Sequence, residues 1–596
     1  MTEVTIDRAR IHYRTYGSPR PGEPPVVLIH GSTIDGQTDW GHLAPLLARD
    51  RLVVVPDCRG HGRSTESGET YSFARLAADT AALIEALGYQ RAHIVGHSNG
   101  GNVALVMLVE HPDVVATCVV QAGNAYVSSD LLELEPGKFD PDRVEREDPA
   151  WRDEMIRLHG PWHGPEYWRR LLRITVAEIV SEPRYAPDDL ARADRPLLVI
   201  EGADDSVNAT AGHAAFIADH VPAAELWRPD GVNHNVHHER PLEWIERVES
   251  FWERRGSPAA DAIWRLREER FADQRGTVFE LRLREEAGVA ALEGTVLDHE
   301  GHRAASAALT GFVVEEHVTV LLDDARWALI APWLSDIRAH PSSRAERLTQ
   351  ALGGEVVRTL DERDGWTRLR LQRDGYVGWA PTRALVPVSE VQAQEVEVTA
   401  TLRVTADFAE AYRSPQGGLV GRLPFGTRLC ALERQGGWSR VGLADGRGWW
   451  VRDDALSVAH TGTVDTAAIA GVLARFTRFI GVPYLWGGRT PYGFDCSGLS
   501  QALWESLGVI IPRDADQQHD AGEPFSGPTR AGDLLFFKAS KTEEGITHVG
   551  IALDATHLLH ASGAAGGTAV NSLDPRDELY DAALLDRFVA ARRVTH

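Results

Sequence analysis

The stretch Ala92-His93-Ile94-Val95-Gly96-His97-Ser98-Asn99-Gly100 decides the fold of the N-terminal region. It begins as an apolar strand run, and a helical pattern follows it from Val103 to Leu108. The glycines on either side of Ser98 permit a sharp turn between strand and helix, which lifts the serine hydroxyl clear of the backbone. A hydroxyl in that position is a candidate nucleophile toward a carbonyl carbon.

The sequence around this turn has the rhythm of a parallel sheet with crossover helices. Short β-branched runs alternate with longer helical patterns from Pro24 to about Trp252. Between the fourth and fifth runs, Leu131 to Asp194 is charged and helical in pattern, as an inserted cap would be. The segment Arg254 to Pro258 then reads as a linker. The predicted strands are Val26–His30, Leu52–Pro56, Ala92–Gly96, Val114–Gln121, Leu197–Glu201 and Ala224–Arg228.

Acidic and basic candidates follow Ser98 in chain order, each at the end of a predicted strand. Gly202-Ala203-Asp204-Asp205 supplies an acid, and Gly231-Val232-Asn233-His234 supplies a histidine. Before the serine, His30-Gly31-Ser32 ends a strand where a backbone amide could join that of Asn99 in an oxyanion hole. These pieces are the components of a serine hydrolase.

Together with the phrase Asp57-x-Arg59-Gly60-x-Gly62-x-Ser64, these residues resemble the α/β-hydrolase superfamily over residues 1–255, with a cap at about 125–194. The resemblance implies Ser98 as nucleophile, His234 as base and Asp205 as orienting acid. Asp204 is the second choice of acid, because the G-x-x-D spacing from Gly202 selects Asp205. The HGGPG phrase of proline iminopeptidases is absent, so ester, amide and lactone cleavage all stay open as reactions.

His237 and His238 lie just beyond His234. No H-E-x-x-H or comparable carboxylate spacing accompanies them, so we predict a loop and no metal site.

A second candidate nucleophile, Cys496, begins a helical run near the C-terminus, in Gly493-Phe494-Asp495-Cys496-Ser497-Gly498. A helix start favours the thiolate form, since it offers unpaired amides and the positive end of the dipole. His548 and His560 lie on successive strand-like runs, so antiparallel pairing could align them. We then expect His548 to deprotonate Cys496 and His560 to orient His548.

The phrases D-C-S-G, H-V-G-I and H-A-S-G, with Ala531-Gly532-Asp533-Leu534, resemble the NlpC-type cysteine peptidases over residues 463–596. Two all-β stretches precede them, and Gly375-Tyr376-Val377-Gly378-Trp379 in the first matches Gly446-Arg447-Gly448-Trp449-Trp450 in the second. This repeat resembles tandem SH3-like domains, at 321–390 and 396–460. Residues 256–320 are predicted to form a small α+β module with two strands, at Val278–Leu283 and Val289–Val296, and no chemistry is assigned to it.

SH3-like domains ahead of an NlpC-type domain resemble the γ-D-glutamyl-L-diamino-acid endopeptidases. The resemblance implies cleavage of murein-derived peptides that begin with a free L-Ala, with Tyr376, Asp495 and Ser497 holding the free amine. Glu346 is a further acidic candidate for the same role. Ala515 stands where the family carries a substrate-binding serine, which affects fine specificity.

Composition limits the classes of partner. The chain has 596 residues, enough for about four domains. Its 62 Lys and Arg against 86 Asp and Glu give a net charge of −24, which disfavours nucleic acid and anionic membranes. The four cysteines are scattered, so we expect no disulfide framework. No apolar run has the roughly 18 residues of a membrane span, and the N-terminus lacks a signal pattern.

The sequence therefore predicts a multidomain cytoplasmic protein with two hydrolytic sites. One is a cysteine endopeptidase acting on murein-derived peptides, and the other a serine hydrolase for a small ester or amide. Neither site calls for a cofactor or metal. The alternative is a peptidoglycan-binding or scaffold protein in which one catalytic set is vestigial. The serine hydrolase's substrate, the preferred diamino acid, the oligomeric state and any coupling between the sites do not follow from the sequence.

Overall fold

The computed structural model describes residues 3–20, 23–49, 51–66, 72–208, 212–286, 289–442, 447–459, 464–541 and 545–595. The predicted domain limits at residues 1, 460, 463 and 596 lie outside them. The chain forms two compact units. Unit 1 comprises Met1–Arg270, Glu280–Gly294 and Arg303–Val318, and unit 2 comprises Phe271–Phe279, Thr295–His302 and Thr319–His596. Within the described ranges, no helix is both long and apolar enough to span a bilayer.

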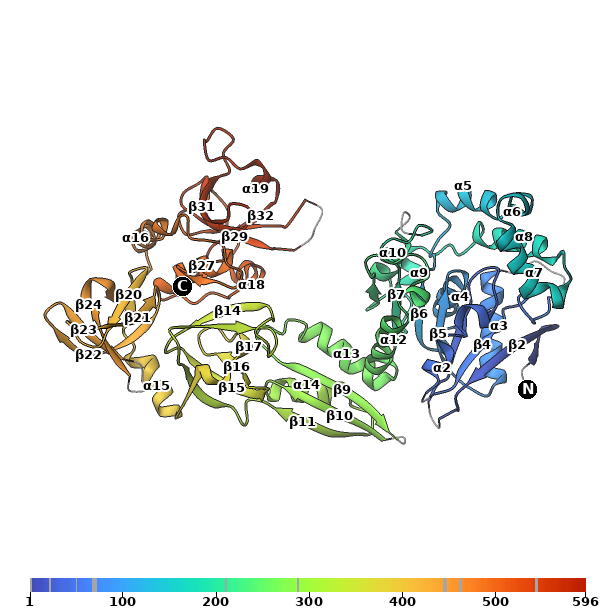
Figure 1. The fold of residues 1–596 in the computed structure, drawn as a ribbon, viewed down its shortest axis with the longest axis horizontal. Helices are drawn as coiled ribbons and strands as arrows, with labels where there is room; N and C mark the ends of the chain where they lie inside the picture. The colour runs from blue at the N-terminus through green and yellow to red at the C-terminus, as the bar shows by residue number, and fades with distance from the viewer. Residues whose placement is uncertain are drawn as a thin grey trace. The chain divides into compact units, whose positions relative to one another are not determined.

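Unit 1 is built on an eight-stranded sheet with the strand order β1-β2-β4-β3-β5-β6-β7-β8 (Figure 1). Strands β3 to β8 are parallel, and β1 and β2 add an antiparallel edge. All six predicted strands are present, with ends that differ by one residue or less. The strands are β1 (Glu3–Ile6), β2 (Ala9–Tyr16), β3 (Val26–Ile29), β4 (Val53–Pro56), β5 (Ala92–His97), β6 (Val115–Gln121), β7 (Leu197–Ile200) and β8 (Glu225–Trp227).

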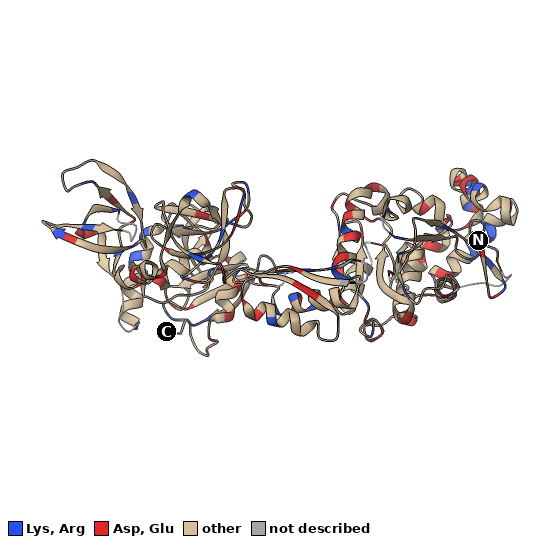
Figure 2. Ribbon diagram, turned by 90° about the horizontal axis from the view of Figure 1, so that it is seen from below, with Lys and Arg blue, Asp and Glu red and all other residues tan. Residues whose placement is uncertain are grey.

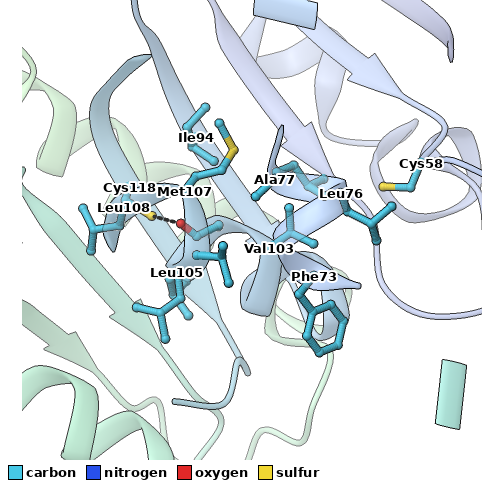
Figure 3. Close-up of a cluster of buried hydrophobic side chains, with 14 of the residues drawn as sticks. Cys58, Phe73, Leu76, Ala77, Ile94, Val103, Leu105, Met107, Leu108 and Cys118 are labelled. Carbon is cyan, nitrogen blue, oxygen red and sulfur yellow. Dashed lines mark hydrogen bonds between the residues drawn. The ribbon is translucent and has the colours of Figure 1, made fainter. Parts of the chain in front are cut away.

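The sheet separates two apolar cores, because successive side chains of a strand point to opposite faces. In β3, Val27 and Ile29 join one core, and Val26 and Leu28 join the other. Figure 3 shows part of the first core, in which side chains of α3 (Phe73–Ala86) and α4 (Asn99–Glu110) pack together. Burial on both faces explains why these strands are almost wholly apolar.

Four of the helices between β6 and β7 lie in the segment that the sequence predicts to be a cap: α5 (Ser129–Lys138), α6 (Pro141–Glu147), α7 (Pro149–His163) and α8 (Tyr167–Ile179). The short helices α1 (Gly36–Trp40), α2 (Ala44–Leu47), α9 (Pro187–Leu190), α10 (His213–His220) and α11 (Val236–Glu239) connect strands or loops. The predicted linker is shorter than expected. Helix α12 (Pro241–Arg255) runs almost directly into α13 (Pro258–Arg270), since the Arg255 guanidinium is buried against Asp261, at 2.7 Å, and Trp264.

The α+β module contains one strand more than the sequence predicted. Its sheet has the order β11-β10-β9, and α14 (His299–Ala308) lies between β10 and β11 in the chain. The added strand, β11, is Val314–Val320, whose Glu-Glu-His centre conceals its strand pattern. The other strands are β9 (Phe279–Glu286) and β10 (Val289–Val296).

The two SH3-like regions have the same topology, as the sequence repeat predicts. The first sheet has the order β14-β13-β17-β16-β15-β12-β18, and the second has the equivalent order β21-β20-β24-β23-β22-β19-β25. Helix α15 (Glu390–Thr399) joins them. The first comprises β12 (Arg326–Ile330), β13 (Leu334–Arg338), β14 (Arg347–Leu352), β15 (Val356–Arg363), β16 (Trp366–Leu371), β17 (Val377–Pro381) and β18 (Leu385–Val388). The second comprises β19 (Leu402–Val404), β20 (Phe408–Tyr412), β21 (Leu419–Pro424), β22 (Arg428–Gln435), β23 (Trp438–Gly442), β24 (Gly448–Arg452) and β25 (Leu456–Val458).

The C-terminal domain packs helices against an antiparallel sheet of order β31-β30-β29-β28-β32. Its strands are β28 (Leu534–Phe537), β29 (His548–Ala552), β30 (His557–Ser562), β31 (Gly567–Ser572) and β32 (Phe588–Arg592), with a hairpin of β26 (Arg489–Thr490) and β27 (Gly493–Phe494). Its helices are α16 (Thr466–Phe476), α17 (Cys496–Ser506), α18 (Ala515–Ala521) and α19 (Ala582–Asp586). Acidic and basic residues are intermixed along both units (Figure 2).

Candidate active sites

Cys496 is the first residue of α17, and Asp495 is the N-cap. The Asp495 carboxylate accepts a hydrogen bond from the Gly498 amide at 2.6 Å. A side chain at Gly498 would collide with the chain, since its Cβ would lie 2.1 Å from the Gly488 carbonyl oxygen. The D-C-S-G phrase therefore places the cysteine at a capped helix start.

Burial dominates the environment of the Cys496 thiol and opposes the thiolate form that a helix start favours. Burial and the adjacent Asp495 carboxylate raise its pKa to about 12, although the amides of Val549 and Ser497 act in the opposite direction. The cysteine is 8% exposed. Desolvation outweighs the helix dipole at this position, so the nucleophile needs a base.

A chain of hydrogen bonds fixes the protonation pattern of His548, the candidate base. The His560 ring contacts the Asn571 side-chain oxygen through Nε2 at 2.8 Å and His548 Nε2 through Nδ1 at 2.7 Å. Since that oxygen only accepts, His560 carries its proton on Nε2 and accepts at Nδ1 from His548. His548 therefore keeps a lone pair on Nδ1. Burial, then the neighbouring His560, lowers the pKa of His548 to about 3.

Sequence reasoning missed Asn571 and Arg513. Asn571 stands in Thr-Ala-Val-Asn on β31, which has no distinguishing pattern. Arg513 precedes the predicted Ala515 position, and its guanidinium is fully buried. It donates to the Asp495 carboxylate at 2.7 Å and to the Ser497 hydroxyl at 2.9 Å. A buried cation thus compensates the carboxylate beside the nucleophile.

The remaining predicted amine-binding residues lie on the first SH3-like domain. Tyr376 is 5% exposed, and its hydroxyl donates to the Asp514 carboxylate at 2.8 Å. Glu346 is exposed and accepts from the Trp486 indole at 2.8 Å. Contacts from this domain thus reach both segments that flank the nucleophile, one before Cys496 and one after it.

Ser98 lies at the junction of β5 and α4 with φ of 56°, a conformation that few non-glycine residues adopt. Both neighbouring glycines are required. A Cβ on Gly96 would lie 1.9 Å from the Gly100 carbonyl oxygen, and one on Gly100 would lie 2.3 Å from the Ile29 carbonyl oxygen. This strained turn presents the hydroxyl as the sequence pattern predicts.

His234 is oriented by Asp205, with 2.9 Å between Nδ1 and the carboxylate. Burial would raise the pKa of Asp205, but the bond to His234 and the amides of Val207 and Asn208 hold it below its usual value. Asp204 is exposed, so the geometry favours Asp205 as the acid.

The two predicted oxyanion residues lie on either side of Ser98. Asn99 is the first residue of α4, and Ser32 follows β3. A Cβ on Gly31 would lie 3.4 Å from the Ser98 Cβ, which places the Gly31-Ser32 turn against the nucleophile. Backbone amides next to a nucleophile are common donors of the oxyanion hole in acyl transfer.

Asp39, which sequence reasoning also missed, forms a hydrogen bond to this turn. Its buried carboxylate accepts from the Gly31 amide at 2.9 Å and lies 3.0 Å from both His97 Nδ1 and His237 Nε2. Burial would raise the pKa of Asp39, but the histidines hold it well below its usual value. One carboxylate therefore links the candidate oxyanion turn to the residue that precedes Ser98.

Asp39, His237 and His238 form the single group within the described ranges whose atoms are spaced to hold a metal ion. The protonation pattern opposes that use. The Trp244 indole donates to the Gln121 oxygen at 2.8 Å, so the Gln121 amide nitrogen donates to His237 Nδ1 at 2.7 Å. His237 therefore carries its proton on Nε2, facing Asp39, where a metal would need a lone pair.

Comparisons with known proteins agree with this domain architecture. Residues 24–241 match the model of the alpha/beta hydrolase fold, 337–385 that of the bacterial dipeptidyl-peptidase Sh3 domain, and 481–588 that of the NlpC/P60 family. A Bacillus subtilis gamma-D-glutamyl-L-lysine dipeptidyl-peptidase is 30% identical over 245 residues, or 40% of this chain and 78% of the relative. The chain belongs to the NlpC/P60 family.

The N-terminal domain has relatives of its own. The human serine hydrolase BPHL is 26% identical over 259 residues, which is 42% of this chain and 85% of that protein.

Among solved structures, the match to a Bacillus cereus NlpC/P60 family protein spans 45% of this chain and 99% of that one, with 22% identity and a TM-score of 0.40. The chain is a bifunctional hydrolase that joins an α/β-hydrolase domain to an NlpC/P60 peptidase domain, and a scaffold with a vestigial site is not favoured.

The histidine chain predicts the pH dependence of peptidase turnover. Because the pKa of His548 is lowered to about 3, the base stays neutral well below pH 6.5. We expect kcat/KM to be flat from about pH 5 to about pH 7 and, on the acid side, to fall only in stronger acid. An acid limb centred near pH 6.5 in the wild-type protein would contradict this assignment.

Asn571→Ala frees the far end of the chain of hydrogen bonds and should lower the kcat of the peptidase by about tenfold.

The Asp39 contacts predict that a substitution of this residue lowers ester turnover at the serine hydrolase site and leaves the peptidase site unaffected. Asp39→Asn replaces an acceptor of several hydrogen bonds with a group that must also donate, so the Gly31 turn loses its support. We expect kcat for p-nitrophenyl acetate to fall between about tenfold and about a hundredfold, with peptidase turnover unchanged. His238→Ala is the matched control, because that side chain is 41% exposed and lies 3.5 Å from the same carboxylate. Equal losses in both variants would refute the positioning role of Asp39.

Proposed function

We propose that the C-terminal domain cleaves the bond between γ-D-glutamate and the diamino acid in murein-derived peptides that begin with free L-Ala. The observation that carries this proposal is the Tyr376 hydroxyl, which donates to Asp514. The Tyr376 hydroxyl oxygen therefore remains able to accept a hydrogen bond from a substrate ammonium. The hydrogen bond that the hydroxyl donates to Asp514 makes this oxygen a stronger acceptor. The Bacillus subtilis relative, named for the same type of bond, supports the proposal.

In the proposed reaction, His548 Nδ1 takes the proton of Cys496, and the thiolate attacks the γ-carbonyl carbon of the D-glutamate. The tetrahedral intermediate collapses as His548 returns the proton to the leaving amine of the diamino acid. Water, deprotonated by His548, then cleaves the thioester and releases L-Ala-D-Glu. The neutral pair of thiol and imidazole described above is the starting state for this sequence.

Amine recognition in this proposal depends on a balance of charge around the nucleophile. Asp495 and Asp514 are both close to Arg513, and Asp514 is also bound by Arg275 at 3.1 Å. A substrate ammonium would meet the Tyr376 hydroxyl, the Ser497 hydroxyl and the Asp495 carboxylate, with Glu346 as an outer anion. An N-acetylated peptide has no ammonium and would leave these acceptors without a charged partner.

For the N-terminal domain we propose hydrolysis of a small ester or amide. His234 would take the proton of Ser98, Asp205 would hold the imidazolium, and the amides of Ser32 and Asn99 would bind the oxyanion. The leaving group would receive the proton from His234, and water would release the acid. The substrate class is the widest one compatible with an intact serine, histidine and aspartate.

The same proposal places the protein in the cytoplasm, where short murein peptides with a free L-Ala would be its substrates. Fractionation of native cells tests this location, and recovery of the protein outside the cell would overturn it.

A crossed variant experiment tests both activities. Purified wild type, Cys496→Ala and Ser98→Ala are incubated with L-Ala-γ-D-Glu-meso-diaminopimelate, its L-Lys analogue and p-nitrophenyl acetate, and products are followed by mass spectrometry and absorbance. Cys496→Ala should lose peptide cleavage by about a millionfold and keep ester turnover, and Ser98→Ala should do the reverse.

The N-acetylated peptide is the control for amine recognition and should stay intact. If the wild type leaves both free-amine peptides uncut, the substrate proposal fails. If Cys496→Ala still cuts them, the assignment of the nucleophile fails.

A further inference from the structure

The segment Phe271–Phe279 connects α13 to the module's first strand and lies in unit 2. Sequence reasoning assigned this module no chemistry. In the structure, Val278 packs in an apolar cluster with Val377 and Leu360 of the first SH3-like domain. The segment is therefore anchored beside the strand that follows Tyr376.

Arg275 in this segment makes two kinds of contact with the Tyr376 region. Its backbone carbonyl accepts from the Val377 amide at 2.7 Å, directly after Tyr376. Its guanidinium donates to Asp514 at 3.1 Å and to both oxygens of Asp516, at 2.8 and 2.7 Å. One residue thus holds both the backbone next to the tyrosine and the carboxylate that accepts the tyrosine's hydrogen bond.

The contact is specific in geometry. The same Asp514 oxygen, Oδ2, accepts from both the Tyr376 hydroxyl and Arg275 Nη1. Without the Arg275 contact, the Asp514 carboxylate could rotate, and the hydrogen of the Tyr376 hydroxyl would then have no fixed acceptor. Asp273 also binds Arg275 at 2.8 Å, so the arginine itself is held in place.

Arg275 and Tyr376 also line one cavity of about 740 Å³, together with Gly276, Arg513 and Gln517. Arg513 continues from this cavity to Asp495 and Ser497, the two neighbours of Cys496. The segment is therefore part of the wall of a cavity that reaches Tyr376.

We propose that Arg275 is a positioning residue for recognition of the substrate's free amine, acting through Asp514 on the Tyr376 hydroxyl. Asp514, held by Arg275, accepts the hydrogen bond of the Tyr376 hydroxyl and so orients the oxygen lone pair toward the ammonium. The α+β module thereby contributes to the specificity of the peptidase domain. This inference rests on the proposed role of Tyr376 in binding the free L-Ala.

The kinetic test uses the full chain as wild type, Arg275→Met, Arg275→Lys and Tyr376→Phe, with L-Ala-γ-D-Glu-L-Lys as substrate. Loss of the arginine's charge-assisted bonds should raise KM by about tenfold with kcat changed little, and Arg275→Lys should recover part of the loss. Arg383→Met removes an exposed arginine of the first SH3-like domain, which also contains Tyr376, and its KM and kcat should match those of the wild type. Wild-type KM in Arg275→Met would overturn the inference.

A second measurement does not depend on turnover. Tyrosine labelled with ¹³C at Cζ gives one NMR signal for Tyr376, assigned by its absence in Tyr376→Phe. Arg275→Met should shift this signal and Arg383→Met should not. If the wild type fails to cut the peptide, the proposed function is lost, and the shift alone decides the positioning role: an unchanged signal overturns it. If Arg275→Met does not fold, Asp514→Asn and Arg275→Lys provide the same two readouts.

Discussion

The fully buried guanidinium of Arg513 is the interaction on which the peptidase site depends. It joins the N-cap of the catalytic helix, the Ser497 hydroxyl and Thr349 of the first SH3-like domain, with distances of 2.7, 2.9 and 2.8 Å. A buried cation without its carboxylate is costly, by about 3–5 kcal/mol, so these groups are held together as a set. The SH3-like domain is thereby tied to the nucleophile through one side chain.

The two candidate active sites position their nucleophiles in different ways. Each places a nucleophile at the start of a helix, where glycines allow a close approach of the backbone. Ser98 is presented by a strained backbone, with φ of 56°, whereas Cys496 is itself helical and follows a capping aspartate. In both, the reactive group is neutral at rest, so an oriented histidine is needed to activate it.

Each histidine is oriented by the chemistry of its surroundings. An anionic Asp205 holds His234, which suits a base that becomes an imidazolium. His548 is held by neutral His560 and Asn571, and its low pKa follows from burial and a second imidazole. The tautomer in this second site is fixed at its far end, by an amide oxygen that can only accept.

The sequence by itself determined the order of domains, the six parallel strands of the hydrolase and the two sets of candidate catalytic side chains. These features are local, since a turn such as Gly96–Gly100 or a capped helix start such as Asp495–Cys496 is written in adjacent residues. Periodicity could also show the repeat of the SH3-like domains, although β11 was missed because charged residues interrupt its pattern.

Only the tertiary structure decided the pairings between distant segments. Arg513 with Asp495, Asn571 with His560, Asp39 with Gly31 and Arg275 with Asp514 are each separated along the chain by at least 8 residues, and the last pair by 239. An arginine or asparagine in isolation carries no sign of its partner. Burial was equally invisible to sequence patterns, and it raises the pKa of Cys496, because the free-energy cost of desolvating the thiolate exceeds the stabilisation that the helix start provides.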